Sequence, residues 1–143
     1  MTQITRMGKI LYEELSGAII GASMDVLNEL KPGLDEKLYE RALVIELQRR
    51  GHEIDIQHSF PVFYRDQPIG NLIPDLIVDN TIIVDPKVVS AFNDTHIAQM
   101  MGYLAISGLE LALLLNFSSA HLQWKRVVRQ TRTEPNVPDL HAY

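Results

Sequence analysis

The spacing of apolar residues near the start of the chain predicts an amphipathic helix. From about Met7 to Leu30 the apolar side chains recur at steps of three and four residues, which is the spacing of one helix face. The segment Lys31-Pro32-Gly33 ends this helix, because proline and glycine both interrupt helical backbone. Its apolar positions are Leu11, Leu15, Ala18, Ile19, Ala22, Val26 and Leu30.

Two further helices follow the same period. The second is predicted from about Leu34 to Arg50, with Asp35 and Glu36 in a first turn where the helix dipole favours negative side chains. The third is predicted to follow the capping segment Asn93-Asp94-Thr95 and to reach Ser107, before Gly108. The positions predicted to be buried are Leu38, Ala42, Leu43 and Ile45 in the second helix, and Ile97, Met101, Leu104 and Ala105 in the third.

A period of two predicts strands in the remaining segments. Residues 52–65 alternate around a break at Ser59-Phe60-Pro61, which indicates one antiparallel strand with a bend. Two apolar runs between residues 69 and 89 flank a polar turn at Asp79-Asn80, so a hairpin is expected there. Residues 111–117 and 122–128 form the last two predicted strands. The predicted order is α-α-β-β-β-α-β-β, an α/β fold that begins its strands with a three-strand meander.

Composition limits the class of protein. A chain of 143 residues with 46% hydrophobic content has the size of one domain, which we assign to residues 1–129, with a flexible tail over residues 130–143. It has no cysteine and no apolar run long enough for a membrane span, so a soluble cytoplasmic protein is expected. The net charge of −5 argues against a protein that coats nucleic acid non-specifically.

The predicted hairpin carries the strongest candidate chemistry. Asp85 and Lys87 are two residues apart on one strand and project to the same face, while the turn brings Asp75 back opposite or diagonal to Asp85. A hard cation such as Mg²⁺ takes carboxylate oxygens, water and substrate phosphate as ligands. Asp75 and Asp85 would supply carboxylates, Pro86 a backbone carbonyl, and Lys87 a charge that orients water or offsets the transition state. The competing interpretation is an exposed ion pair of little energetic value.

Two pairs on the helices extend this candidate site. Glu36 and Tyr39 are three residues apart, and Gln99 and Tyr103 are four apart, so each pair shares a helix face. Packed against the hairpin, Glu36 would contact the metal or its waters, and Gln99 with Tyr103 would hold a phosphate or a carboxylate. The alternative is that Glu36 is a helix-start charge and that the tyrosines are core residues with satisfied hydroxyls.

Other polar residues give weaker signals. The basic residues near the end of the chain are a candidate phosphate contact, or else a solvated strand end. The histidines show no HxH or HExxH spacing, which argues against a zinc hydrolase. His58 lies on the strand before the hairpin, where it could approach the site, but an ordinary surface histidine is the simpler expectation. No Gly-x-Ser-x-Gly elbow is present. The basic residues are Lys125, Arg126, Arg129 and Arg132, and the histidines are His52, His58, His96, His121 and His141.

The run Gly33-Leu34-Asp35-Glu36-Lys37-Leu38-Tyr39 resembles the motif that names the GxxExxY protein family. The resemblance covers residues 15–128. The GxxExxY family in turn looks like a small branch of the PD-(D/E)xK nuclease superfamily. Residues 99–103 are similar to the QxxxY motif of RecB-like exonucleases. The further matching segments are Tyr39-Glu40-Arg41-Ala42-Leu43, Pro74-Asp75-Leu76-Ile77-Val78, Val84-Asp85-Pro86-Lys87, Ala98-Gln99 to Tyr103-Leu104 and Leu114-Leu115-Asn116-Phe117.

The resemblance implies a restriction-endonuclease-like core, with a central mixed sheet flanked by helices, and a Mg²⁺ or Mn²⁺ cofactor. It implies metal ligation by Asp75 and Asp85, a catalytic role for Lys87, an acidic role for Glu36 and supporting roles for the second helical pair. The chain departs from the family by having Asp85-Pro86-Lys87 where Glu-Leu-Lys is usual, and Lys31-Pro32-Gly33 where Gly-Pro-Gly is usual. A proline in a central strand marks a bulge or a site that is drifting from activity.

Two functional hypotheses follow. The first is a metal-dependent nuclease that hydrolyses phosphodiester bonds, of DNA rather than RNA, through activated water. The second is a catalytically silent nuclease fold that serves as a nucleic-acid-binding or protein-interaction module and forms a homodimer. A small-molecule hydrolase is weaker, because no nucleophile or apolar pocket can be read from the chain.

Overall fold

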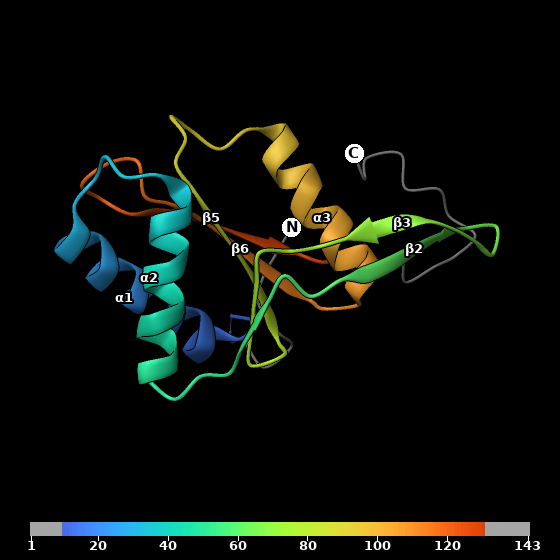
Figure 1. Ribbon diagram of the computed structural model, residues 1–143, viewed down its shortest axis with the longest axis horizontal. Helices are drawn as coiled ribbons and strands as arrows, with labels where there is room; N and C mark the ends of the chain where they lie inside the picture. Colours follow the sequence, from blue (N-terminus) through green and yellow to red (C-terminus); the bar gives the residue numbers. More distant parts are fainter. Residues whose placement is uncertain (1–9, 131–143) are drawn as a thin grey trace.

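A computed structural model describes residues 10–130, which form three helices and seven strands (Figure 1). The second and third predicted helices are confirmed to within two residues at each end. In chain order the elements are α1 (Glu13–Leu30), α2 (Glu36–Arg49), β1 (Ile54–Ile56), β2 (Phe60–Tyr64), β3 (Gln67–Leu72), β4 (Leu76–Val78), β5 (Ile82–Lys87), α3 (Asp94–Ser107), β6 (Leu111–Asn116) and β7 (Gln123–Val128).

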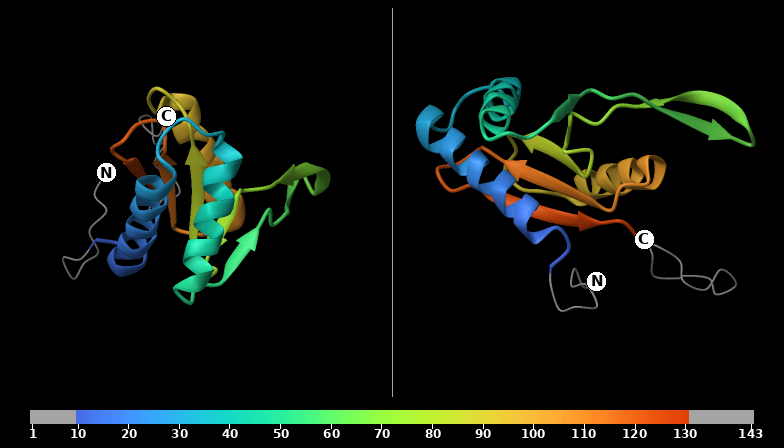
Figure 2. Two further views of the ribbon diagram at one scale, coloured as in Figure 1. Left: turned by 60° about the vertical axis from the view of Figure 1, so that its left-hand side comes forward. Right: turned by 90° about the horizontal axis from the view of Figure 1, so that it is seen from below.

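Five strands form a mixed central sheet in the order β1-β4-β5-β6-β7. Only β5 and β6 are parallel, and α3 makes the crossover that a parallel pair requires. The antiparallel β4–β5 hairpin turns at Asp79 and Asn80, which have φ values of 51° and 54°, as a type I′ turn demands. The strands β2 and β3 form a separate two-stranded ribbon that extends away from this sheet (Figures 1 and 2).

The central sheet separates two apolar cores. The helices α1 and α2 cover one face, where Ile19 and Leu43 pack with Val84, and α3 covers the other, where Met100 packs with Ile83. Successive side chains of a strand alternate between these faces. Asp85 and Lys87 therefore follow Ile83 onto the α3 face of β5, which is the face where α3 presents its own polar residues.

The predicted fold class is confirmed: a mixed sheet flanked by helices, with the order α-α-β-β-β-α-β-β when only the strands of the central sheet are counted. The prediction of one bent strand over residues 52–65 is wrong. Gln57 has a φ of 55°, which turns the chain out of the sheet, and Phe60 then pairs with Leu72 of the ribbon. Asp55 and Tyr64 consequently belong to different sheets.

Helix boundaries and faces also differ in part. The helix predicted from Met7 begins at Glu13, after Tyr12 with a φ of 51°, and residues 7–9 lie outside the described part. In α2, Leu43 is buried as predicted, but Leu38 and Ile45 are exposed, and Tyr39 and Leu47 complete the buried face. In α3, Ala105 is exposed, while Met100 and Leu104 are buried.

Parts of two predictions concern residues that the structure does not describe. The predicted tail over residues 130–143 lies outside the described residues except for Gln130, and Arg132 and His141 fall there too. Within residues 10–130, no helix is long and apolar enough to cross a membrane.

Candidate active site

Two prolines end the pairing of β4 with β5 where the acidic residues begin. The last pair of the register is Leu76 with Val84, and its continuation would set Asp75 opposite Asp85 and Pro74 opposite Pro86. The Asp75 and Asp85 side chains do share a hydrogen bond. The Phe117 N–H donates to the Lys87 carbonyl, so the backbone polar groups of Lys87 face β6. The nitrogen and carbonyl of the preceding residue, Pro86, therefore face the β4 side. Neither proline has an N–H to continue the ladder. The pairing of β4 and β5 therefore stops beside the two aspartates.

This geometry also corrects the expectation of a bulge at Pro86. The β5–β6 register runs without interruption from Ile82 opposite Leu111 to Lys87 opposite Asn116. The missing donor of Pro86 faces the β4 side, beyond the end of the β4–β5 ladder, so the proline removes no bond that the central sheet uses. Its carbonyl points to the same side.

The Asp85 side chain is buried on the α3 face of the sheet. Its residue is 3% exposed, and burial raises the pKa of Asp85 to about 7. The charge of Asp75, and a hydrogen bond with it, also raise this pKa, whereas Lys87 lowers it. Two carboxyl groups in such contact share a proton or require a cation between them.

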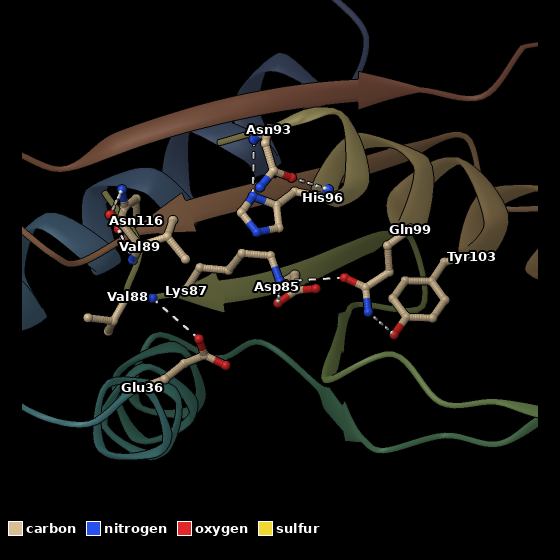
Figure 3. A network of polar contacts seen from close by, with 10 residues as sticks. All are labelled: Glu36, Asp85, Lys87, Val88, Val89, Asn93, His96, Gln99, Tyr103 and Asn116. Atoms are coloured by element: carbon tan, nitrogen blue, oxygen red, sulfur yellow. Dashed lines mark hydrogen bonds and ion pairs between the residues drawn. The ribbon is translucent and has the colours of Figure 1, made fainter. Parts of the chain in front are cut away.

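The Lys87 ammonium group lies between Asp85 and Gln99 of α3 (Figure 3). Its Nζ is 3.5 Å from Asp85 Oδ1 and donates to Gln99 Oε1 at 3.4 Å. The Lys87 side chain is largely buried, which fixes the position of the ammonium group within the site. The structure thus brings Asp75, Asp85 and Lys87 to one place on one face of the sheet.

Gln99 and Tyr103 extend the polar contacts along α3 (Figure 3). Gln99 Nε2 donates to the Tyr103 hydroxyl at 3.0 Å, while its oxygen accepts from Lys87. Burial raises the pKa of Tyr103, and the negative charges of Asp85 and Asp75 raise it further. Both side chains therefore stand within the electrostatic field of the aspartates.

Glu36 reaches the edge of the same site from the opposite layer. It is the first residue of α2, and its Oε1 accepts from the Val88 N–H at 3.3 Å (Figure 3). Its charge contributes to the raised pKa of Asp85. Lys37, the next residue, pairs with the buried Glu40 at 2.9 Å and also interacts with the charge of Asp75.

Tyr39 lies in the core and not among the polar side chains around Asp85. Tyr39 is fully buried in the core between α1, α2 and the sheet, and its ring stacks on Phe117 with centroids 4.9 Å apart. Its hydroxyl donates to the Lys31 carbonyl and accepts from the Leu34 N–H. Tyr39 therefore fixes the loop between α1 and α2, and this loop sets where α2 and Glu36 begin.

Sequence reasoning missed two residues that hold the site elements. The buried Asn116 side chain accepts from the Val89 N–H at 3.2 Å and donates to the Val89 carbonyl at 2.8 Å, so it holds the chain beyond Lys87. His96 closes a capping box with Asn93 at the start of α3. The Asn93-Asp94-Thr95 segment signalled that cap, but no local signal identifies Asn116, whose partner is 27 residues away.

The basic residues near the end of the chain do not form one patch in the described structure. Arg126 donates to Ser16 and to the Leu11 carbonyl, so it ties β7 to the start of α1. Lys125 and Arg129 alternate with Arg126 along the chain, and Val127 between them packs on the α3 side. These cations are therefore divided between the two sides of an edge strand.

Three of the described histidines, His52, His58 and His96, contact residues other than Asp75 and Asp85. His52 contacts Asp79 at 2.7 Å, and this contact, with the Glu53 N–H, lowers the pKa of Asp79 against the opposing effect of burial. His58 pairs with Asp55 at 2.8 Å and packs on Phe60. These pairings agree with the expectation that His58 is a surface histidine.

The chemistry of the donors suits a hard divalent ion. Among residues 10–130, no group of three His, Asp or Glu side chains is close enough to hold a metal by itself. Magnesium, however, is commonly bound by one or two carboxylates, with water and substrate phosphate filling the other positions. Asp75 and Asp85 are such a pair, and burial together with the charge of Asp75 raises the pKa of Asp85 although Lys87 opposes the shift.

The fold and these residues define an α/β domain with an acidic pair and a lysine at the end of a central hairpin. A family model for the PD-(D/E)XK nuclease superfamily matches residues 13–127, and the chain belongs to that superfamily. No curated protein and no solved structure matches the chain. Membership indicates a nuclease-like function with a nucleic-acid substrate, and nucleases of this superfamily generally use divalent metals.

Proposed function

We propose that this chain is a Mg²⁺- or Mn²⁺-dependent nuclease that hydrolyses phosphodiester bonds, of DNA rather than RNA. We assign the activity to one domain, residues 1–129, of the GxxExxY type. The observation that carries the proposal is the opposition of Asp75 and Asp85 at the end of the β4–β5 ladder, with Lys87 beside them. An acidic pair with a buried member, Asp85, and an adjacent ammonium group suits phosphodiester hydrolysis better than it suits a stable core.

In this proposal Asp75, Asp85 and the Pro86 carbonyl hold the ion. When bound, the ion would polarise the phosphate and lower the pKa of a water molecule. Lys87 orients that water and offsets the negative charge that develops on the phosphate. Gln99 accepts from Lys87 and so aims its ammonium group, and Tyr103 fixes Gln99. Glu36, at the site edge, would hydrogen-bond a metal-bound water.

The test measures ion binding and cleavage separately. Calorimetry with Mn²⁺ should show binding to the wild type that is lost in Asp75→Ala and kept in Asp55→Ala, an exposed aspartate on β1. Cleavage of a labelled oligonucleotide in Mn²⁺ should fall by at least about 100-fold in Lys87→Ala, since electrostatic groups of this kind contribute about 2.7–4 kcal/mol. Lys125→Ala, which changes an exposed lysine of β7, should cleave like the wild type.

A second candidate is a catalytically silent nuclease fold that binds nucleic acid or protein, as a homodimer. It is favoured by the absence of a third acidic ligand beside Asp75 and Asp85 among the described residues. Such a module would bind no Mn²⁺ and cleave nothing in the same assays. Cleavage by the wild type that is sensitive to Lys87→Ala would rule it out.

A further inference from the structure

The β2–β3 ribbon, residues 60–72, exposes large apolar side chains that the fold does not require. Phe63, Tyr64 and Ile69 are 59%, 61% and 66% exposed, and all three stand in the half of the ribbon farther from the sheet (Figures 1 and 2). Threonine or lysine would maintain the same strand pairing with better solubility. Exposed rings gathered on a projecting element indicate a contact surface.

The ribbon leads directly into the candidate active site. Strand β3 ends at Leu72, and Asp75 follows three residues later. The six residues of β3 span about 20 Å at about 3.3 Å each, and Phe63 and Tyr64 pair with its first residues, so the rings stand about one strand length from the segment that leads into Asp75. A nucleic-acid strand that lay along the ribbon would therefore lead toward the aspartate pair.

The ribbon carries no net charge, so it repels a polyanion less than the rest of this acidic chain does. Residues 56–74 contain one acidic residue, Asp66, and one arginine, Arg65, in a chain whose net charge is −5. The Arg65 guanidinium lies 5.5 Å from the centroid of the Tyr64 ring, and its Nε donates to the Tyr64 hydroxyl. A ring with an adjacent guanidinium provides stacking for a base and a cation for its phosphate.

The backbone of the ribbon disfavours a second copy of the chain as its occupant. Proline cannot donate within a ladder, so Pro61 of β2 and Pro68 of β3 must turn their nitrogens to the outer edges. Each edge therefore lacks a donor that strand addition would need. The exposed rings remain as the surface that can bind a partner.

We propose that the ribbon binds the unpaired bases of a nucleic-acid strand that enters the candidate active site, with Phe63 and Tyr64 stacking on bases and Arg65 contacting a phosphate. The location of the cut phosphate rests on the proposed function. Bases inside a duplex are already stacked on their neighbours, so these rings select single strands or splayed ends.

The experiment measures binding by the full chain in EDTA, where no cleavage occurs. A fluorescein-labelled 12-nucleotide single strand and its blunt duplex serve as probes in anisotropy titrations. The double variant Phe63→Leu with Tyr64→Leu keeps the apolar surface but removes the aromatic faces. We expect its Kd for the single strand to rise by about tenfold per ring. Phe63→Trp should bind as the wild type does, and so should Ile45→Ala, which changes an exposed apolar residue of α2.

Several outcomes would overturn the inference: equal single-strand binding by the leucine variant, no single-strand binding by the wild type, or tighter binding of the blunt duplex. A wild-type dimer that becomes monomeric in the leucine variant, seen by light scattering, would assign the ribbon to a second copy instead. Because binding is measured without metal, the two proposals fail separately. Ribbon-dependent binding without cleavage contradicts only the nuclease, and cleavage with unchanged leucine-variant binding contradicts only the ribbon.

Discussion

Asp85 makes the stability of the metal-free protein depend on pH in an unusual direction. Its pKa is raised from 3.8 to about 7 on folding, so the folded state holds a proton that the unfolded chain releases. The contribution of Asp85 to the free energy of unfolding is therefore most favourable below about pH 4, and it falls as the pH rises toward 7. A shift of about three units corresponds to roughly 4 kcal/mol.

We predict that Asp85→Asn removes most of this pH dependence. Denaturant unfolding in EDTA at pH 5, 6, 7 and 8 should show the wild type losing stability up to about pH 7, while the variant remains nearly level. The variant should be the more stable protein at pH 8, because asparagine carries no buried charge. Parallel curves for the two proteins would contradict the assignment of a raised pKa to Asp85.

Tyr39 allows the structural and functional roles of a residue to be separated. Its hydroxyl is the buried link between the Lys31 carbonyl and the Leu34 N–H. Tyr39→Phe should lower the free energy of unfolding by about 1 kcal/mol, because two part-buried backbone groups lose their hydrogen-bond partner. Mn²⁺ affinity should remain within a factor of two. A loss of Mn²⁺ binding without loss of stability would return Tyr39 to the site.

At the scale of elements, Asn116 couples the ends of β5 and β6. The side chain replaces the ladder bonds that would hold the segment after Lys87, and it also accepts from the Ser118 N–H at 3.1 Å. Asn116→Ala should cost about 2–3 kcal/mol and speed hydrogen exchange at Val89. Asn28→Ala, which changes an exposed residue of α1, should do neither. Slow exchange at Val89 in Asn116→Ala would show that the strand ends are held by other contacts.

The sequence could predict the elements and the centre of the site because both are encoded locally. Alternation places Asp85 and Lys87 on one face, and a turn with positive φ at Asp79 and Asn80 returns the chain so that Asp75 opposes Asp85. The ribbon could not be separated from the sheet, because residues in either have the same period of two. What separates them is the pairing partner of Phe60, which is a contact between distant positions.

The same limit explains the error on α2. Leu38 and Ile45 have the right spacing for an apolar face, and so do Tyr39, Leu43 and Leu47. Both stripes fit a period of 3.6, and only the sheet and α1 decide which one is buried. The sequence favoured the purely aliphatic stripe over the one that contains Tyr39. In the structure the Tyr39 ring is buried and stacks on Phe117.

At the scale of the whole molecule, the structure consists of a two-core body and a ribbon attached at its base. The buried core contains no residue of the ribbon, although Phe60 packs against it in part. The Gln57 N–H donates to the Asp75 carbonyl at 3.0 Å, so the two ends of the segment that carries the ribbon lie close together. Residues 59–73 can therefore be replaced by an Asn-Gly turn, which closes a two-residue hairpin of the preferred type.

We predict that this shortened chain folds and keeps its metal site, because the described contacts of Asp75, Asp85 and Lys87 lie within the central sheet, α2 and α3. The loss of the partly buried Phe60 should cost no more than about 2 kcal/mol. Calorimetry should find Mn²⁺ affinity close to that of the full chain, and anisotropy should find single-strand binding reduced as strongly as in the leucine variant. If the shortened chain folds but loses its affinity for Mn²⁺, the ribbon is part of the metal site, and the division of the molecule into a catalytic body and a binding arm is wrong.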